Sequence, residues 1–228
     1  MRFDIITIFP ESLKGYFNSS ILARAQKDKK IKINLHNLRD FAQDKHKKTD
    51  DKPYGGGPGM VLKIEPIAKA ISKIKSKISN LLAGKAGLEN YKIILFSPSG
   101  KQFTQKMARN WAKKYDNLIM ICGRYEGVDA RVKKILKAEE ISIGPYIITG
   151  GELPAAVVAD AVARQIHGVL GKEESLEEER GMSGFPAYTK PEVLEHNGKK
   201  YSVPKILLSG HHINIKNWRE KRSKKFKF

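Results

Sequence analysis

Short runs rich in β-branched residues alternate with stretches whose apolar residues recur at helical spacing, and this alternation constrains the fold most. A parallel strand pair needs a crossover between its strands, usually a helix. The alternation therefore predicts an α/β fold with a mostly parallel sheet, covered by helices on both faces. The predicted strands are residues 2–8, 30–38, 92–97, 117–122 and 140–148, and the predicted helices are residues 10–25, 64–82, 102–115, 128–136 and 153–165.

Three glycine-bearing loops follow strands of this predicted sheet, at residues 97–101, 122–127 and 143–154. Ligands of parallel sheets bind outside the carboxyl ends of the strands, so these loops predict a ligand site. The first strand is not followed by the G-x-G-x-x-G pattern of dinucleotide binding, and the chain has no P-loop ending in G-K-[ST]. The histidines are scattered, and the adjacent pair His211 and His212 does not have the spacing of metal ligands on one helix face.

A further glycine-rich stretch, DDKPYGGGPGMVL at residues 50–62, precedes the predicted helix 64–82. Glycine permits positive φ and a close approach of another molecule to the backbone, at a cost in conformational entropy. A flexible linker is the alternative, but linkers are usually featureless and rich in Gly and Ser. Here Pro53 and Pro58 fix φ, and an apolar run follows at once. We therefore interpret the stretch as a loop shaped for a ligand.

The charge of the chain indicates its partner. Lys and Arg number 43 against 24 Asp and Glu, which gives a formal net charge of +19 over 228 residues. This excess favours an anionic polymer, with nucleic acid first, whereas an AT-rich genome or simple solubility is the alternative explanation. Lysines gather at residues 46–48, 75–77 and 221–228, where they would neutralise phosphates.

The single cysteine, Cys122, excludes a disulfide framework and a thiolate zinc site. No apolar run is long enough for a signal peptide or a membrane span. We expect a soluble, cytoplasmic protein with no membrane partner. An acidic, glycine-punctuated stretch predicts a linker at residues 169–184, between a large domain of residues 1–168 and a small basic domain of residues 185–228.

Eight motifs follow one another along nearly the whole chain. They are IFPE (8–11), the block ending in PYGGGPGM (39–60), FSPSG (96–100), CGRYEG (122–127), SIGPYIITGGELP (142–154), DAVAR (160–164), PAYTKPEV (186–193) and LLSGHHINIKNWR (207–219). Together these motifs resemble the TrmD family of bacterial tRNA (guanine-N1)-methyltransferases. That family belongs to the SPOUT methyltransferases. The resemblance implies an α/β fold whose mostly parallel sheet contains a deep trefoil knot, followed by a small, mainly helical C-terminal domain that binds tRNA.

The reaction that the resemblance implies is methyl transfer from S-adenosylmethionine to N1 of the guanosine on the 3′ side of the anticodon in tRNA. The N1 proton must leave, so a base is needed, and a cation near O6 would stabilise the developing charge. The resemblance gives the role of the cation to Arg164, for which a surface position on an amphipathic helix is the alternative. It gives the role of the base to Glu179, where the family has an aspartate. Glu177 and Glu178 are alternatives because the segment is shorter here, and a solvated acidic linker is the alternative for all three.

The resemblance also implies two sets of binding residues, a cofactor set in the glycine-bearing loops and an RNA set near residue 55 and near the C-terminus. Pro145 stands where the family usually has aspartate, which removes a carboxylate and a backbone N–H from the pocket rim. Alternative interpretations are a packed aromatic for Tyr125, a surface acid for Glu126 and a core residue for Trp218. The cofactor set is Phe96, Ser97, Pro98, Gly123, Tyr125, Glu126, Ile143, Gly144, Pro145, Tyr146, Ile147, Ile148, Gly150, Gly151 and Pro154. The RNA set is Asp50, Tyr54, Gly55, Gly56, Gly57, Pro58, Gly59, Ser209, Gly210, His211, His212 and Arg219.

Members of this family are homodimers in which the C-terminal domain of one subunit closes over the pocket of the other, and the resemblance implies the same here. Mg²⁺ is a further expectation from the resemblance. Two other functions stay open. One is a SPOUT enzyme that methylates a different RNA guanosine, and the other is a non-catalytic RNA-binding protein that retains the fold. A non-catalytic RNA-binding protein would not need both the glycine-bearing loops and Arg164.

Overall fold

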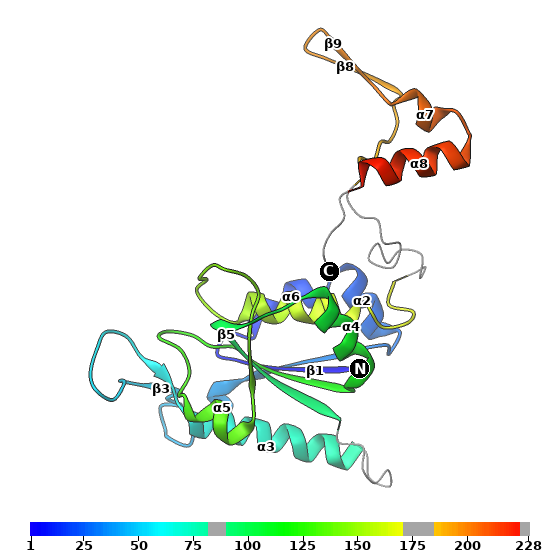
Figure 1. The fold of residues 1–228 in the computed structure, drawn as a ribbon. Coiled ribbons are helices and arrows are strands. Elements are labelled where there is room, and N and C mark those ends of the chain that lie inside the picture. The colour runs from blue at the N-terminus through cyan, green and yellow to red at the C-terminus, as the bar shows by residue number, and fades with distance from the viewer. Residues whose placement is uncertain (82–89, 171–184, 224–228) are drawn as a thin grey trace. The chain divides into compact units, whose positions relative to one another are not determined.

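The chain forms two compact units, Met1–Gly171 and Lys172–Phe228, in a computed structural model (Figure 1). The structure describes residues 1–81, 90–170 and 185–223. Most of the predicted linker, including Glu177, Glu178 and Glu179, therefore lies outside the described residues. The boundaries of the domains at 1–168, 169–184 and 185–228 stay a prediction.

Five parallel strands form the sheet of the first unit, in the order β2, β1, β6, β5, β7. The middle strands are buried on both faces, as the apolar runs of a covered parallel sheet require. The predicted α/β class with a parallel sheet is confirmed, and the knot stays an expectation from the resemblance. The strands are β1 (Arg2–Thr7), β2 (Lys32–Asn37), β5 (Tyr91–Gln102), β6 (Asn117–Ile121) and β7 (Glu139–Ser142).

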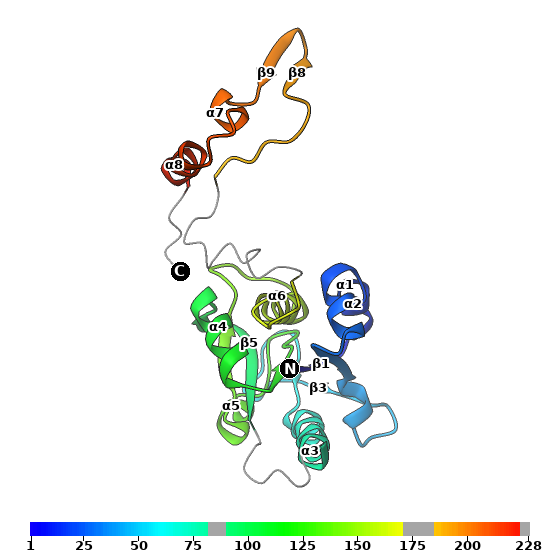
Figure 2. The same cartoon turned by 90° about the vertical axis from the view of Figure 1, so that its right-hand side faces the viewer.

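Helices cover both faces of this sheet (Figure 1 and Figure 2). Side chains alternate along β1, so that Phe3 and Ile5 face one helical layer and Ile6 faces the other. None of the helices in the described ranges is long and apolar enough to cross a lipid bilayer. The first layer consists of α1 (Glu11–Phe17), α2 (Ser20–Lys27), α4 (Gln105–Lys114) and α6 (Glu152–Ala163), and the second of α3 (Ile64–Leu81) and α5 (Arg131–Leu136).

Two predicted elements are too long. The helix predicted over residues 10–25 is two helices, because Asn18 ends α1 and Ser20 has a φ of 50°, which a continuous right-handed helix does not accommodate. The strand predicted over residues 140–148 ends at Ser142. The hydroxyl of Ser142 donates to the carbonyl oxygen of Gly144 at 2.9 Å, which turns the chain away from the sheet.

The glycine-rich stretch forms a loop that is closed at its base. β3 (Asp50–Asp51) pairs with β4 (Val61–Leu62) in an antiparallel ribbon, after the short helix η1 (Leu38–Phe41). The backbone N–H of Lys63 donates to the carbonyl oxygen of Thr49 at 2.8 Å. A flexible linker would not have its two ends joined in this way, so the interpretation as a shaped loop is favoured.

The second unit contains a hairpin that the sequence analysis did not predict, with β8 (Val193–His196) paired to β9 (Lys199–Ser202). Asn197 and Gly198 at its tip have φ values of 50° and 70°. Asn-Gly with two positive φ values is typical of a two-residue hairpin turn, so this dipeptide was the available signal. α7 (Lys205–Leu208) and α8 (His212–Arg222) follow. The α8 residue Trp218 is half-buried against Tyr188, with ring centroids 6.4 Å apart.

Candidate active site

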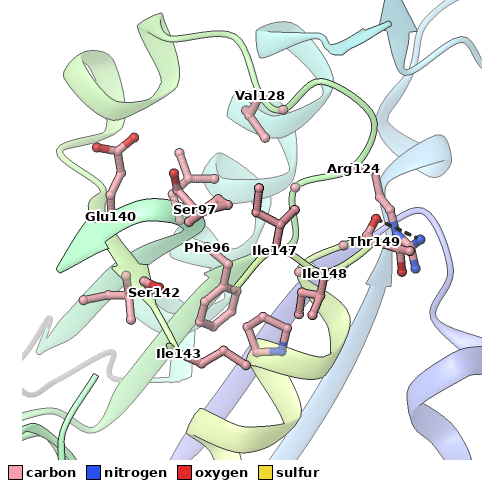
Figure 3. A pocket seen from close by; sticks show the side chains of 18 of the residues that line it. Phe96, Ser97, Arg124, Val128, Glu140, Ser142, Ile143, Ile147, Ile148 and Thr149 are labelled. Atoms are coloured by element: carbon pink, nitrogen blue, oxygen red, sulfur yellow. Dashed lines mark hydrogen bonds between the residues drawn. The ribbon is translucent and has the colours of Figure 1, made fainter. Parts of the chain in front are cut away.

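A cavity of about 350 Å³ lies at the carboxyl ends of β5, β6 and β7, where the three glycine-bearing loops converge (Figure 3). Its walls therefore come from segments that are far apart in the sequence. Of the predicted cofactor residues, thirteen line it: Phe96, Ser97, Pro98, Gly123, Tyr125, Glu126, Ile143, Tyr146, Ile147, Ile148, Gly150, Gly151 and Pro154.

Gly144 and Pro145 do not line the cavity, although they were predicted with this set. They lie in the turn after β7, where the ring of Tyr146 packs against Gly144. A Cβ at Gly144 would lie 2.3 Å from Cε1 of Tyr146, so glycine here leaves space for the tyrosine ring to fold back. The hydroxyl of Tyr146 donates to the carbonyl oxygen of Ile143 at 3.3 Å. Gly144 thus supports a wall residue and is not one itself.

The walls combine an apolar surface with a few polar groups. Figure 3 shows Phe96, Ile143 and Ile148 gathered on one side of the cavity, with Ser97 and Glu140 on another. Tyr125 lies on the rim with a φ of 59°, a left-handed conformation that is costly for a residue with a side chain. Such strain collects at ligand sites, where the surrounding loop enforces it. A pocket of this kind suits a ligand with a planar ring and a few polar groups.

Glycines in these loops allow backbone to pack directly on backbone. A Cβ at Gly151 would lie 2.5 Å from Cα of Cys122 and 2.8 Å from the backbone nitrogen of Gly123. A Cβ at Gly100 would lie 2.5 Å from the backbone nitrogen of Ile141. The backbone N–H of Gly151 donates to the carbonyl oxygen of Gly123 at 2.9 Å. Any side chain at Gly151 or Gly100 would push the cavity walls apart.

A partly buried ion pair, which the sequence analysis did not identify, joins two of these walls. Glu152 is 4% exposed, and its Oε2 accepts from Nε of Arg124 at 2.9 Å. Its Oε1 accepts from the hydroxyl of Thr7 at 2.5 Å. Arg124 also donates to the carbonyl oxygen of Thr149 at 3.3 Å, and its guanidinium lies 4.9 Å from the ring centre of Phe9. The available signal was a charged residue directly after a glycine pair, in the first turn of a helix, where a carboxylate is favoured.

Thiolate chemistry is not supported at this site. Cys122 directly follows β6 and is buried, and burial raises the pKa of its thiol well above the ordinary value, with a smaller contribution from the Glu152 carboxylate. A protonated, buried thiol is a poor nucleophile. Within residues 1–81, 90–170 and 185–223, no group of three or more His, Cys, Asp or Glu side chains is placed to hold a metal ion.

The glycine-rich loop is joined to the cavity rim. The backbone N–H of Glu126 donates to the carbonyl oxygen of Met60 at 3.0 Å, and that of Leu62 donates to the carbonyl oxygen of Gly127 at 3.0 Å. A Cβ at Gly59 would lie 2.5 Å from Oε1 of Glu126. The predicted RNA residues Asp50, Tyr54, Gly55, Gly56, Gly57, Pro58 and Gly59 therefore belong to a loop next to the cavity, and Tyr54 at its tip is fully exposed.

Arg164 lies at the opposite end of α6 from the cavity. Pro154, in the first turn of α6, lines the cavity, and Arg164 follows the last turn and is half-buried. At 1.5 Å per residue the two positions are about 15 Å apart along the helix axis. The structure therefore does not bring Arg164 to the cavity of its own chain. Asp160 of the same motif accepts from the hydroxyl of Tyr16, which raises the pKa of Tyr16 to about 12.

The remaining predicted RNA residues lie in the second unit. Ser209 follows α7, Gly210 has a φ of 71°, His211 directly precedes α8, and His212 is its first residue. All four are exposed. Arg219 is exposed on α8, and its guanidinium lies 5.2 Å from the ring centre of Phe185. An exposed turn with two imidazoles and a cation stacked on a ring is a surface that unstacked bases could contact.

Comparison with known proteins gives one consistent family. The family model described as tRNA (guanine-1)-methyltransferase TrmD matches residues 1–227. A protein named tRNA (guanine-N(1)-)-methyltransferase from Dictyoglomus turgidum is 51% identical over 100% of this chain and 87% of its own length. Proteins of the same name from Desulforamulus reducens and Ruminiclostridium cellulolyticum are 49% and 45% identical, each over 98% of this chain, and over 84% and 91% of their own lengths.

Proposed function

The chain belongs to the TrmD family of tRNA (guanine-1)-methyltransferases, which are SPOUT enzymes, and we propose how its residues carry out the reaction of this family. The protein methylates N1 of the guanosine on the 3′ side of the anticodon in tRNA, with S-adenosylmethionine as the methyl donor. The observation that carries the proposal is the convergence of the three glycine-bearing loops on one cavity.

We propose that this cavity holds the donor. The apolar wall of Phe96, Ile143 and Ile148 suits the adenine ring, and the backbone groups of the glycine loops suit its polar edge. Of the two acids in the walls, Glu140 is paired with Lys133. Glu126 has no such ion pair among the described residues, and we assign it to the positively charged end of the donor. When bound, the donor supplies a methyl group already activated on a sulfonium sulfur.

The protein's remaining work is to orient the guanine, remove its N1 proton and stabilise the charge at O6. We propose Glu179 as the base, with Glu178 and Glu177 as alternatives, and Arg164 as the cation at O6. Proton removal by a carboxylate and stabilisation by a guanidinium are the two contributions that this chemistry needs. The closed loop at residues 52–60, joined to the rim at Glu126, supports its proposed contact with the target nucleoside.

We propose that the active enzyme is a homodimer and that Arg164 serves the cavity of the partner chain. Its distance from its own cavity, about 15 Å along α6, supports this arrangement. So does the surface of α6, where Leu153 is 65% exposed and Val157 is 47% exposed. These residues are four positions apart and share one helix face. A second copy of the chain would cover this exposed apolar face of α6, the helix whose first turn lines the cavity.

We propose that the second unit and the glycine-rich loop bind tRNA in the cytoplasm, where the substrate is found. The exposed turn at residues 209–212 and Arg219 would contact bases and phosphates of the RNA. Mg²⁺ is proposed only as an ion that accompanies the RNA. The described residues offer no group of carboxylate or imidazole ligands for it, and no catalytic step is assigned to it.

One experiment tests this proposal. The protein is incubated with methyl-labelled S-adenosylmethionine and unmodified tRNA, and the modified nucleoside is mapped. We expect 1-methylguanosine next to the anticodon, and the matched control is a transcript with adenosine at that position. Label at a different guanosine would indicate the other SPOUT activity. Tight tRNA binding with neither label transfer nor donor binding would indicate a non-catalytic binding protein.

The base is tested by the same assay under single-turnover conditions. Glu177→Gln, Glu178→Gln and Glu179→Gln are compared one at a time. The variant that lacks the base should be slower by roughly a hundredfold, whereas donor binding should not change. Wild-type rates in all three variants would exclude the acidic segment from proton removal.

A further inference from the structure

A second cavity, of about 370 Å³, lies between the edge strand β2 and helix α3, apart from the site described above. Its lining residues are all polar, and none is acidic. They come from β1, β2 and α3 and are Arg2, Lys32, Asn34, His36, Lys77 and Asn80. Lys and Arg make up 43 of the 228 residues, about one in five, yet they provide three of these six. The cavity is thus more basic than the chain as a whole.

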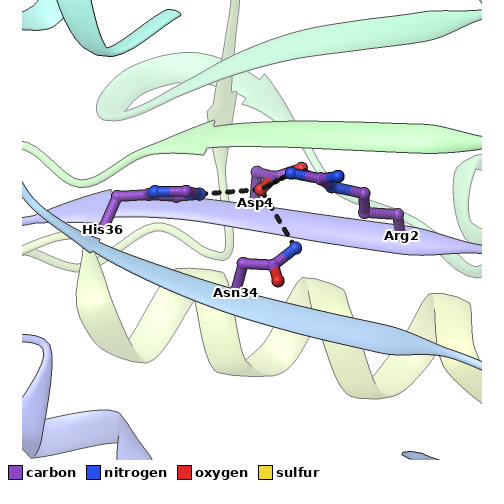
Figure 4. A network of polar contacts seen from close by, with 4 residues as sticks. All are labelled: Arg2, Asp4, Asn34 and His36. Carbon is purple, nitrogen blue, oxygen red and sulfur yellow. Dashed lines mark hydrogen bonds and ion pairs between the residues drawn. The ribbon is translucent and has the colours of Figure 1, made fainter. Parts of the chain in front are cut away.

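A buried carboxylate holds part of this lining in place (Figure 4). Asp4 is 0% exposed, and it accepts from Nε and Nη2 of Arg2 at 2.5 and 2.9 Å. Its Oδ1 lies 2.7 Å from Nε2 of His36 and accepts from the amide of Asn34 at 3.1 Å. A buried ion pair is a weak source of stability but fixes the orientation of its members. Asp4 therefore orients Arg2, His36 and Asn34 as one unit.

The lining carries more positive charge than the single negative charge of Asp4 can neutralise. The Asp4 carboxylate neutralises Arg2, and the two cations Lys32 and Lys77 remain on opposite sides, one on the sheet edge and one on α3. A lysine on an edge strand also serves to block strand pairing between molecules. That role would explain Lys32 alone. It does not explain why Lys77, from a different element, meets Arg2 and His36 at the same hollow.

We propose that this cavity binds a phosphate group, and that in the working enzyme the phosphate belongs to the tRNA backbone. Phosphate oxygens accept hydrogen bonds from several donors at once. The lining offers the ammonium groups of Lys32 and Lys77, the amide of Asn80 and those N–H groups of Arg2 that do not donate to Asp4. Lys77 also belongs to the lysine cluster at residues 75–77, which the described active site does not use. The inference rests on the proposed function in one respect, because that function identifies the phosphate-bearing partner as tRNA.

The test compares two double variants that change the net charge equally. Lys32→Gln with Lys77→Gln removes both cavity lysines, and Lys106→Gln with Lys113→Gln removes two exposed lysines of α4, outside the cavity lining. Affinity for tRNA is measured over a range of salt concentrations. The cavity variant should bind about tenfold more weakly, with a slope of log affinity against log salt that is shallower by about 1. Its methyl-transfer rate at saturating tRNA should equal that of the wild type.

A second arm uses inorganic phosphate and follows the ring resonances of His36 by NMR at constant ionic strength. The wild type should show a saturable shift that the cavity variant loses and the α4 variant keeps. A shift without any difference in tRNA binding would assign the site to free phosphate and overturn the RNA source. Equal behaviour of the two variants in both arms would overturn the proposal. A wild type that fails to methylate tRNA would refute the proposed function, while the phosphate arm would still decide the cavity.

Discussion

Arg124 and Glu152 form a partly buried ion pair across 2.9 Å, and each of them is hydrogen-bonded to a further segment of the chain. Glu152 accepts from Thr7 on β1, and Arg124 donates to the carbonyl oxygen of Thr149. The pair therefore fixes the loop after β6 against the start of α6. A Cβ at Gly150 would lie 2.3 Å from Nε of Arg124, so the same loop is packed around the pair.

Glu152→Ala should destabilise the protein and weaken donor binding together. Removal of Glu152 leaves the partly buried guanidinium of Arg124 without its ion-pair partner, which costs about 2 kcal/mol of unfolding free energy. Release of Arg124 should also loosen the cavity and weaken S-adenosylmethionine binding about tenfold, or about 1.4 kcal/mol. Urea unfolding and calorimetry measure the two effects. Glu11→Gln at the exposed start of α1 is the control, and unchanged donor binding in Glu152→Ala would contradict a role for the pair in shaping the cavity.

Gly151→Ala should reduce donor binding, because the added Cβ would meet the backbone of Cys122 and Gly123 at 2.5 and 2.8 Å. Backbone cannot move aside as a flexible side chain can, so the two cavity walls must separate. We expect donor affinity to fall at least about tenfold in calorimetry. Gly15→Ala in α1 is the matched control, since a Cβ there meets nothing within 4 Å. It should bind normally and gain about 0.5–1 kcal/mol of stability. Normal donor affinity in Gly151→Ala would show that the close packing is not needed.

The buried network around Asp4 should make stability depend on pH. Burial alone would raise the pKa of Asp4, but hydrogen bonds from His36 and Arg2 outweigh it and hold the pKa below the ordinary value. A carboxyl with a lowered folded-state pKa stabilises the fold above its unfolded pKa of about 3.9 and loses that effect as pH falls through the folded pKa.

Asp4→Asn should therefore lower the free energy of unfolding by about 3 kcal/mol near neutral pH, and the difference from wild type should shrink below about pH 4. Urea unfolding across this range measures it. Asp28→Asn, at the exposed end of α2, should show no comparable difference. A difference between wild type and Asp4→Asn that is independent of pH would contradict the ionised state of Asp4 in the fold.

The sequence predicted those elements whose pattern is local. Strand 2–8 and helix 64–82 match β1 and α3 closely, because a β-branched run and a helical apolar period are each complete within their own segment. The three glycine-bearing loops were also placed correctly on one cavity, since parallel strands bring their carboxyl ends to one edge.

The buried charges could not be predicted in the same way. Glu152 is bound by groups that lie 28 and 145 residues away, and His36 lies 32 residues from Asp4. Nothing in a local pattern specifies such partners, because they depend on which strands become neighbours. The position of Arg164, in contrast, was available from the sequence, because the predicted helix 153–165 already places it ten residues, or about 15 Å, beyond Pro154.

Leu153→Glu combined with Val157→Glu should dissociate the proposed homodimer. Both side chains are exposed on one face of α6, and two buried carboxylates in an apolar interface carry a large desolvation cost. Light scattering after size exclusion should change from dimer to monomer mass. Ile135→Glu is the control, because Ile135 is 61% exposed on α5, in the opposite helical layer. A double variant that remains a dimer would place the interface elsewhere.

Arg164→Ala should slow methyl transfer by roughly a hundredfold under single-turnover conditions and leave donor binding unchanged. Arg164 follows the last turn of α6, about 15 Å along the helix from the cavity wall at Pro154, so it can stabilise O6 without contacting a donor in its own chain. Arg109→Ala on α4 provides a control for the loss of one arginine. A parallel loss of donor affinity in Arg164→Ala would indicate a structural role.

Mixing two inactive variants tests whether Arg164 serves the partner's cavity. Arg164→Ala retains an intact cavity, and Gly151→Val retains an intact arginine, so a mixed dimer has one site with both parts if the arginine acts across the interface. Co-refolded or co-expressed variants should then regain part of the wild-type activity, whereas either variant alone stays slow. If Arg164 acts within its own chain, no chain in the mixture has both parts and activity is not restored. Absence of recovery in a verified mixed dimer would therefore refute the arrangement across the interface.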